Sequence, residues 1–113
     1  SQVMNVIGDV KGKTCILVDD IIDTAGTICN AADALKKGGA SKVVSYATHA
    51  VLSGPAIERI NNSELDELIV TDTIPLTEAA SKLEKIKIIS MDQTLSEAIN
   101  RVNKEESISA MFL

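Results

Sequence analysis

Apolar residues along this chain gather into short runs that alternate with stretches of helical spacing. Such runs predict β-strands where polar turns bound them. The predicted strands cover 3–10, 14–20, 42–50, 65–72 and 85–91. The run TCILVDD at 14–20 is nearly continuous in apolar residues before its acids, a pattern typical of a strand in a parallel sheet with both faces covered.

The stretches between these runs predict helices. In the first of them, apolar residues recur at i, i+3, i+4 and i+7: Ile28, Ala31, Ala32 and Leu35. Gly38 and Gly39 are expected to end this helix. Ser53 is expected to cap a short helix that has Pro55 in its first turn, and 77–83 forms another short helix.

The C-terminal third predicts one more helix and an edge strand. Thr94 and Glu97 form a capping box, and an apolar stripe follows on one helical face: Leu95, Ala98, Ile99 and Val102. In the tail ESISAMFL at 106–113, serine and isoleucine alternate, and this segment is expected to pair as an edge strand. Because strands and helices alternate, the expected fold is α/β, with a doubly wound, mostly parallel sheet and right-handed crossovers.

Size and composition limit the classes of protein to consider. The chain has 113 residues, the size of one domain, and 45% are apolar but only 2% aromatic. The net charge is -5 and basic residues do not cluster, so no nucleic-acid partner is expected. No apolar run is long enough to span a bilayer, so no membrane partner is expected. Cys15 and Cys29 are expected to be buried thiols of a cytoplasmic protein.

The segment CILVDDIIDTAGT, residues 15–27, carries the candidate chemistry. Ligands of open α/β sheets bind beyond the carboxyl ends of the strands, where this segment is expected. Successive N–H groups of 23–27, at the start of a helix, form an anion-binding cradle for a monophosphate. Thr24 and Thr27 add hydroxyl donors, and Gly26 allows close backbone approach.

Asp19 and Asp20 require a different partner, because ionised carboxylates only accept hydrogen bonds and repel phosphate. A vicinal diol offers two donors, so a sugar phosphate fits the whole segment, and Mg²⁺ could share the carboxylate oxygens. A solvated strand end followed by a helix cap is the alternative reading of the same residues. The chain contains neither GxxxxGK[ST] nor GxGxxG, which disfavours P-loop and dinucleotide sites.

Several stretches together resemble one known family. LVDDIIDTAGT is similar to the ribose 5-phosphate signature of type I phosphoribosyltransferase folds. The flanking stretches VMNVIGDVKGK, YATHAVLSGPA, VTDTIPL and NKEESISAMF resemble, more narrowly, the C-terminal domain of ribose-phosphate pyrophosphokinases. The resemblance implies that 1–113 is the phosphoribosyltransferase-like C-terminal domain of a larger enzyme, without that enzyme's N-terminal domain and mobile catalytic loop.

The family's reaction transfers diphosphate from ATP to ribose 5-phosphate, giving phosphoribosyl pyrophosphate and AMP with Mg²⁺. The resemblance assigns the ribose hydroxyls, and possible contact to a ribose-bound magnesium, to Asp19 and Asp20. It assigns the 5-phosphate to five consecutive residues: Asp23, Thr24, Ala25, Gly26 and Thr27. It places no catalytic residue in this chain, which is expected to be inactive alone, and implies a dimer-based hexamer for the full enzyme.

Other residues remain open on sequence grounds. By order, Ser107 and Ser109 match family serines of a regulatory phosphate or ADP site, with Phe112 alongside, but an edge strand explains them equally. His49 is expected to be structural, and 71–73 either shapes the pocket or caps a turn. A salvage phosphoribosyltransferase and a catalytically silent regulatory subunit are the alternative functions.

Overall fold

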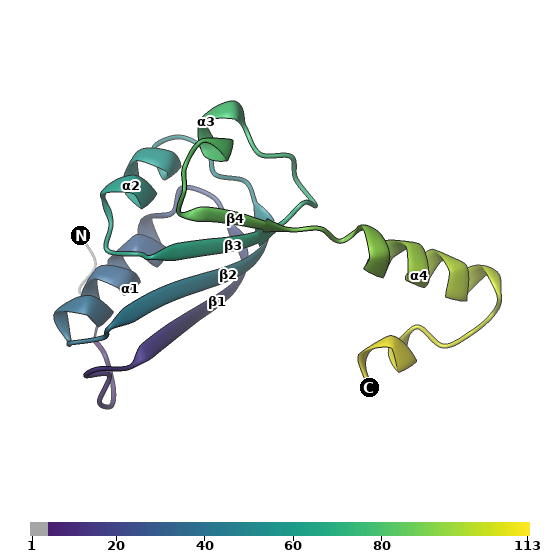
Figure 1. The fold of residues 1–113 in the computed structure, drawn as a ribbon, viewed down its shortest axis with the longest axis horizontal. Coiled ribbons are helices and arrows are strands. Elements are labelled where there is room, and N and C mark those ends of the chain that lie inside the picture. The colour runs from purple at the N-terminus through teal and green to yellow at the C-terminus, as the bar shows by residue number, and fades with distance from the viewer. Residues whose placement is uncertain (1–4) are drawn as a thin grey trace.

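The computed structural model describes residues 5–113 and contains a four-stranded sheet in the order β1-β2-β3-β4. Its strands are β1 (Thr14–Ile22), β2 (Lys42–Ala50), β3 (Glu67–Thr71) and β4 (Ile86–Ile89), and each neighbouring pair is parallel (Figure 1). The expected parallel α/β architecture is confirmed. However, β1 continues past the predicted end at residue 20 to Ile22, so Asp19 and Asp20 lie within the strand rather than at its end.

Four helices connect or follow the strands: α1 (Gly26–Lys37), α2 (Ala56–Asn62), α3 (Glu78–Ser81) and α4 (Asp92–Asn103). The helix α1 ends as predicted, since Gly38 donates its N–H to Ala34 O and Gly39 adopts a φ of 100°. Thr77 caps α3 by accepting the Ala80 N–H at 3.2 Å. Within residues 5–113, no helix is long and apolar enough to cross a membrane.

The core lies on one face of the sheet. Val43, Leu68 and Val70 are almost fully buried there, because α1 and α2 pack against them through Ala32 and Ile60. The opposite face carries no helix among residues 5–113, so the doubly wound arrangement is not complete in this part of the chain. That open face retains exposed Ile16 and Val18.

The two ends of the chain depart from the predictions. The strand predicted at 3–10 is absent over 5–10, where Ile7 is 98% exposed; residues 3–4 lie outside the described residues. A strand needs a paired neighbour for its N–H and C=O groups, and 5–10 has none. The tail predicted as an edge strand instead forms a 3₁₀ helix, Ser109–Phe112.

Two predicted helix caps are wrong. The N-cap of α2 is Pro55, and the Ser53 hydroxyl bonds elsewhere. Thr94 lies inside α4, whose N-cap is Met91. The start of α4 is held by Asp72 at the end of β3, which accepts the Met91 N–H and the Ser90 hydroxyl, both at 2.8 Å. The Met91 N–H, and then the Ser90 hydroxyl, lower the pKa of this exposed carboxyl.

Candidate functional site

The end of β1 and the start of α1 enclose a hollow of about 230 Å³. It is lined by Asp19, Ile21, Ile22, Asp23, Thr24, Ala25, Gly26, Thr27 and Ile28. The structure therefore brings together all five residues expected to hold a phosphate with one of the two strand carboxylates. Such a hollow beyond a strand's carboxyl end is where parallel α/β sheets bind ligands.

Ala25 shapes the turn into α1. It is the N-cap with a φ of 64°, in the left-handed region, and its methyl group is buried. No side chain among the described residues caps this end of α1, and the Ala25 carbonyl accepts the Cys29 N–H at 3.1 Å. The N–H groups of the first turn thus remain free for an anion, which the helix dipole also favours.

The two strand carboxylates are not equivalent. Asp19 lines the hollow, and its Oδ1 accepts the Asp20 backbone N–H at 2.8 Å. Asp20 is exposed and, among the described residues, does not line the hollow. Successive residues of a strand point to opposite faces, which accounts for the difference. Sequence reasoning, which put both acids at the end of a strand and gave them one role, did not separate them.

The carboxyl ends of β2 and β3 are joined by side chains beside this site. The Thr71 and Thr73 hydroxyls donate to Thr48 O at 2.6 and 3.1 Å, and His49 Nδ1 lies 2.8 Å from Thr73 Oγ1. Segment 71–73 thus links two strands, and His49 takes part in that link, which agrees with a structural histidine. Thr71 also lines a separate hollow of about 190 Å³ on the open face of the sheet.

The remaining predictions concern a metal ion and the serines of the tail. No group of three or more His, Cys, Asp or Glu side chains in residues 5–113 is arranged to hold a metal ion. Ser107 and Ser109 are exposed beyond α4, where the Ser107 carbonyl accepts from Arg101 Nη1 at 2.9 Å. A regulatory site at these serines stays a prediction.

Two residues of the site went unnoticed in the sequence. Ser53 bonds to the Asp23 carboxylate, and Arg59 donates from α2 to Thr24 O at 3.2 Å. In the sequence, Ser53 carries only a helix-cap signal, because Pro55 follows it two residues later. Arg59 is an isolated base on a short helix, and no pattern in the sequence links it to the acidic segment.

Comparison with known proteins identifies the family. Residues 2–113 match the model described as the phosphoribosyl synthetase-associated domain. The chain belongs to that family. A ribose-phosphate pyrophosphokinase of Xylella fastidiosa (strain 9a5c) is 60% identical over 113 residues, which is 100% of this chain and 35% of the relative. One of Marinomonas sp. (strain MWYL1) is 62% identical over 112 residues, 99% of this chain and 36% of the relative.

A solved structure of this family shares the fold. The crystal structure of phosphoribosylpyrophosphate synthetase from Mycobacterium smegmatis matches with a TM-score of 0.83 and 44% identity, over 88% of this chain and 33% of that one. The family resemblance seen in the sequence is confirmed, and the chain spans about a third of the length of these relatives. The matches give the share covered and not its position, so they do not support the expected C-terminal placement, which stays a prediction.

Proposed function

We propose that this chain is the ribose 5-phosphate-binding part of a ribose-phosphate pyrophosphokinase. The observation that carries the proposal is the single hollow in which Asp19 meets the turn formed by 23–27. A member of the phosphoribosyl synthetase-associated domain family with this hollow has a cradle for an anion and an acceptor for hydroxyl groups within one small volume.

The phosphate end of the ligand is assigned to the start of α1. The free N–H groups after Ala25 donate to phosphate oxygens, and the Thr24 and Thr27 hydroxyls supplement them. No lysine or arginine lines this hollow among the described residues, so backbone dipoles carry the recognition. That is compatible with an acidic chain of net charge -5.

The sugar end is assigned to the strand carboxylates. Asp19 accepts from a ribose hydroxyl inside the hollow, and Asp20, the next residue of the strand, is assigned the neighbouring hydroxyl on the family resemblance. The same two carboxylates suit Mg²⁺, because this ion commonly takes one or two protein carboxylates and fills its other positions with water and substrate oxygens. When bound, magnesium would neutralise charge on the transferred diphosphate.

The proposed reaction is the one for which the relatives, ribose-phosphate pyrophosphokinases, are named. The anomeric hydroxyl of ribose 5-phosphate attacks the β-phosphorus of ATP, the bond to the α-phosphoryl oxygen breaks, and phosphoribosyl pyrophosphate and AMP form. This chain contributes by holding the acceptor in one orientation, which is the main requirement of in-line phosphoryl transfer. The residues that bind ATP are not assigned to this chain.

Calorimetric titration tests the proposal. The chain is expected to bind ribose 5-phosphate more tightly than ribose or inorganic phosphate alone, since each of these fills half of the site. Asp19→Ala is expected to abolish ribose 5-phosphate binding, because a ribose hydroxyl loses the acceptor that lines the hollow, while leaving inorganic phosphate binding intact. Equal affinities of Asp19→Ala and the unchanged chain for ribose 5-phosphate would refute the sugar assignment.

A further inference from the structure

The loop between β2 and α2 is bound to the acidic segment along its backbone. The N–H groups of Val51 and Leu52 both donate to Ile22 O, at 3.0 and 3.1 Å, and the Ser53 N–H donates to Asp23 O at 3.0 Å. Leu52 is buried and has a φ of 52°, a strained conformation for a leucine. Such strain persists only where surrounding contacts fix the loop, so 51–53 is a firm support for 22–24.

Ser53 adds a side-chain contact to this support. Its hydroxyl donates to Asp23 Oδ1, which ties the carboxylate of the first cradle residue to the neighbouring loop. A free carboxylate beside the N–H groups of a phosphate site would repel the ligand and compete for those donors. The hydrogen bond from Ser53 therefore restrains the Asp23 carboxylate and occupies one of its acceptor positions.

Arg59 supports the next residue of the turn. Its Nη1 donates to Thr24 O at 3.2 Å, and it lies 3.1 Å from the position that a Cβ on Gly26 would occupy. Because a trans peptide is planar, turning the Thr24 carbonyl toward Arg59 turns the Ala25 N–H to the opposite side. One guanidinium thus fixes the orientation of a cradle peptide without lining the hollow.

We propose that Ser53 and Arg59 are positioning residues of the phosphate cradle, Ser53 by restraining the Asp23 carboxylate and Arg59 by orienting the peptide between Thr24 and Ala25. The inference deepens the proposed function and rests on it. Neither residue touches the ligand. Their effect on binding passes through the conformation and the charge placement of 23–25.

The binding test uses Ser53→Ala with Ser53→Thr as the conservative variant. Ser53→Ala is expected to weaken ribose 5-phosphate binding by about tenfold, the size of one lost hydrogen bond to a charged group. Ser53→Thr keeps the hydroxyl and is expected to stay within about threefold of the unchanged chain. Ser41→Ala is the matched control, because the Ser41 hydroxyl is also exposed and, among residues 5–113, bonds only to Gly12 O, at 3.2 Å.

A rescue experiment separates charge placement from loss of structure. In the Ser53→Ala background, Asp23→Asn removes the freed charge and is expected to restore most of the lost affinity. A purely structural role for Ser53 predicts no rescue, and that outcome, like unchanged binding by Ser53→Ala, would overturn the assignment. Arg59→Lys is expected to weaken binding nearly as much as Arg59→Ala, because a lysine lacks the planar donor fork; full affinity in Arg59→Ala would overturn its role.

A measurement without ligand keeps this inference distinct from the proposed function. Hydrogen exchange of the Ser53 and Cys29 amides, which bond to Asp23 O and Ala25 O, is expected to quicken in Ser53→Ala and Arg59→Ala, while the amides of Leu68 and Val70 in the core keep their protection. If the unchanged chain binds no ribose 5-phosphate, the proposed function fails, but this exchange pattern still tests the positioning. Unchanged exchange of the Ser53 and Cys29 amides in both variants would contradict it.

Discussion

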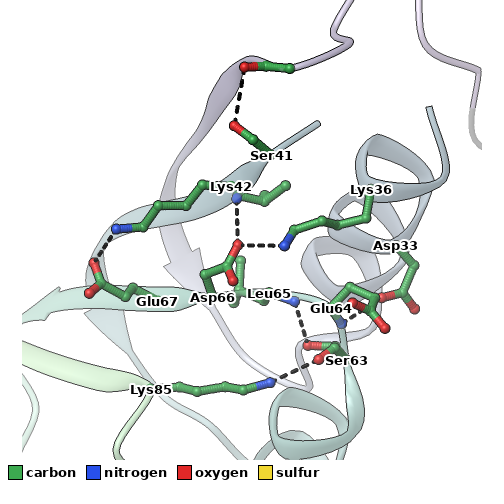
Figure 2. Close-up of polar contacts among 12 residues, drawn as sticks. Asp33, Lys36, Ser41, Lys42, Ser63, Glu64, Leu65, Asp66, Glu67 and Lys85 are labelled. Carbon is green, nitrogen blue, oxygen red and sulfur yellow. Dashed lines mark hydrogen bonds and ion pairs between the residues drawn. The ribbon is translucent and has the colours of Figure 1, made fainter. Parts of the chain in front are cut away.

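At the residue scale, Asp66 shows how one carboxylate organises its neighbourhood. Its Oδ2 accepts the Val43 N–H at 2.7 Å and pairs with Lys36 Nζ at 2.9 Å, so it joins α1, β2 and the segment before β3 (Figure 2). Burial by itself raises the pKa of Asp66, but the Val43 N–H and Lys36 outweigh it, and the pKa lies below its ordinary value. The ionised form is therefore bound more tightly in the folded chain.

We expect Asp66→Asn to lower the free energy of unfolding at pH 7 by about 1 kcal/mol, because the side chain is partly exposed and solvent weakens the lost ion pair. A depressed pKa contributes stability above the ordinary carboxyl pKa of about 4, and this is lost as the pH falls through the lower folded value. The difference between the two proteins should accordingly shrink below about pH 4. Urea unfolding at several pH values measures it.

Glu67→Gln is the control for this prediction. Glu67 is adjacent in sequence and is also partly exposed, but its carboxylate lies 3.9 Å from Lys42 Nζ, a longer ion pair, so its loss should cost less than about 0.5 kcal/mol. A constant gap between Asp66→Asn and the unchanged chain from pH 7 to pH 3 would show that ionisation of Asp66 is not what stabilises the fold.

Also at the residue scale, the sequence predicted the composition of the site better than its geometry. Asp23 and Thr24 are contiguous in the chain with the glycine turn, so adjacency alone placed them together. Ser53 and Arg59 reach them across 30 and 35 positions, through the packing of α2 beside α1. Contacts between residues so far apart in the sequence arise only when the sheet and helices assemble, so local sequence patterns do not reveal them.

At the element scale, α2 is stabilised at its C-terminus by a residue from another segment. Lys85 Nζ donates to three carbonyls, Ile60 O at 3.1 Å, Asn61 O at 3.3 Å and Ser63 O at 2.8 Å. Figure 2 shows the contact between Lys85 and Ser63. Ile60 O also accepts from the Ser63 N–H and hydroxyl, at 3.3 and 2.9 Å, and the negative end of the helix dipole attracts the ammonium group. The lysine thereby joins α2 to the start of β4.

Lys85→Met is expected to lower the free energy of unfolding by about 2 kcal/mol, because the apolar stem remains while three carbonyls, two of them at part-buried contacts, lose a charged donor. The control is Lys82→Met, since Lys82 forms an exposed pair with Glu78 at 3.1 Å and should cost under about 0.5 kcal/mol. Thermal and urea unfolding of both variants measure the contrast. Equal stabilities would mean that water satisfies the end of α2 equally well.

The sequence predicted the helices and strands that pack against the core correctly, but it was less reliable for segments that do not pack. The strand at 42–50 and the helix ending at Gly38 repeat their apolar spacing and contribute to the core, so local pattern and tertiary burial agree. Segment 5–10 has a strand-like pattern but no pairing partner. In α4 the helix was correct, yet its apolar stripe buries none of its residues.

At the scale of the whole molecule, apolar surface is distributed unevenly. The open face of the sheet carries Ile16, Val18, Tyr46 and Ile89 in adjacent registers, from 42% to 80% exposed. The helix α4 extends away from the sheet, with Leu95 and Ile99 exposed on it (Figure 1). One face thus provides the core and the site, while the other is apolar without contributing to either.

This asymmetry predicts that stability and apolar surface can be changed separately. The double variant Ile16→Thr and Val18→Thr should bind much less of a fluorescent apolar dye while its free energy of unfolding changes by less than about 1 kcal/mol, since threonine keeps the strand preference and neither side chain is in the core. Val43→Thr, the same chemical change on the packed face, should cost about 2 kcal/mol without reducing dye binding, because it buries a hydroxyl. Dye fluorescence and urea unfolding measure both quantities. If the double variant were as unstable as Val43→Thr, the face bearing Ile16 would have to be packed in solution, contrary to its exposure here.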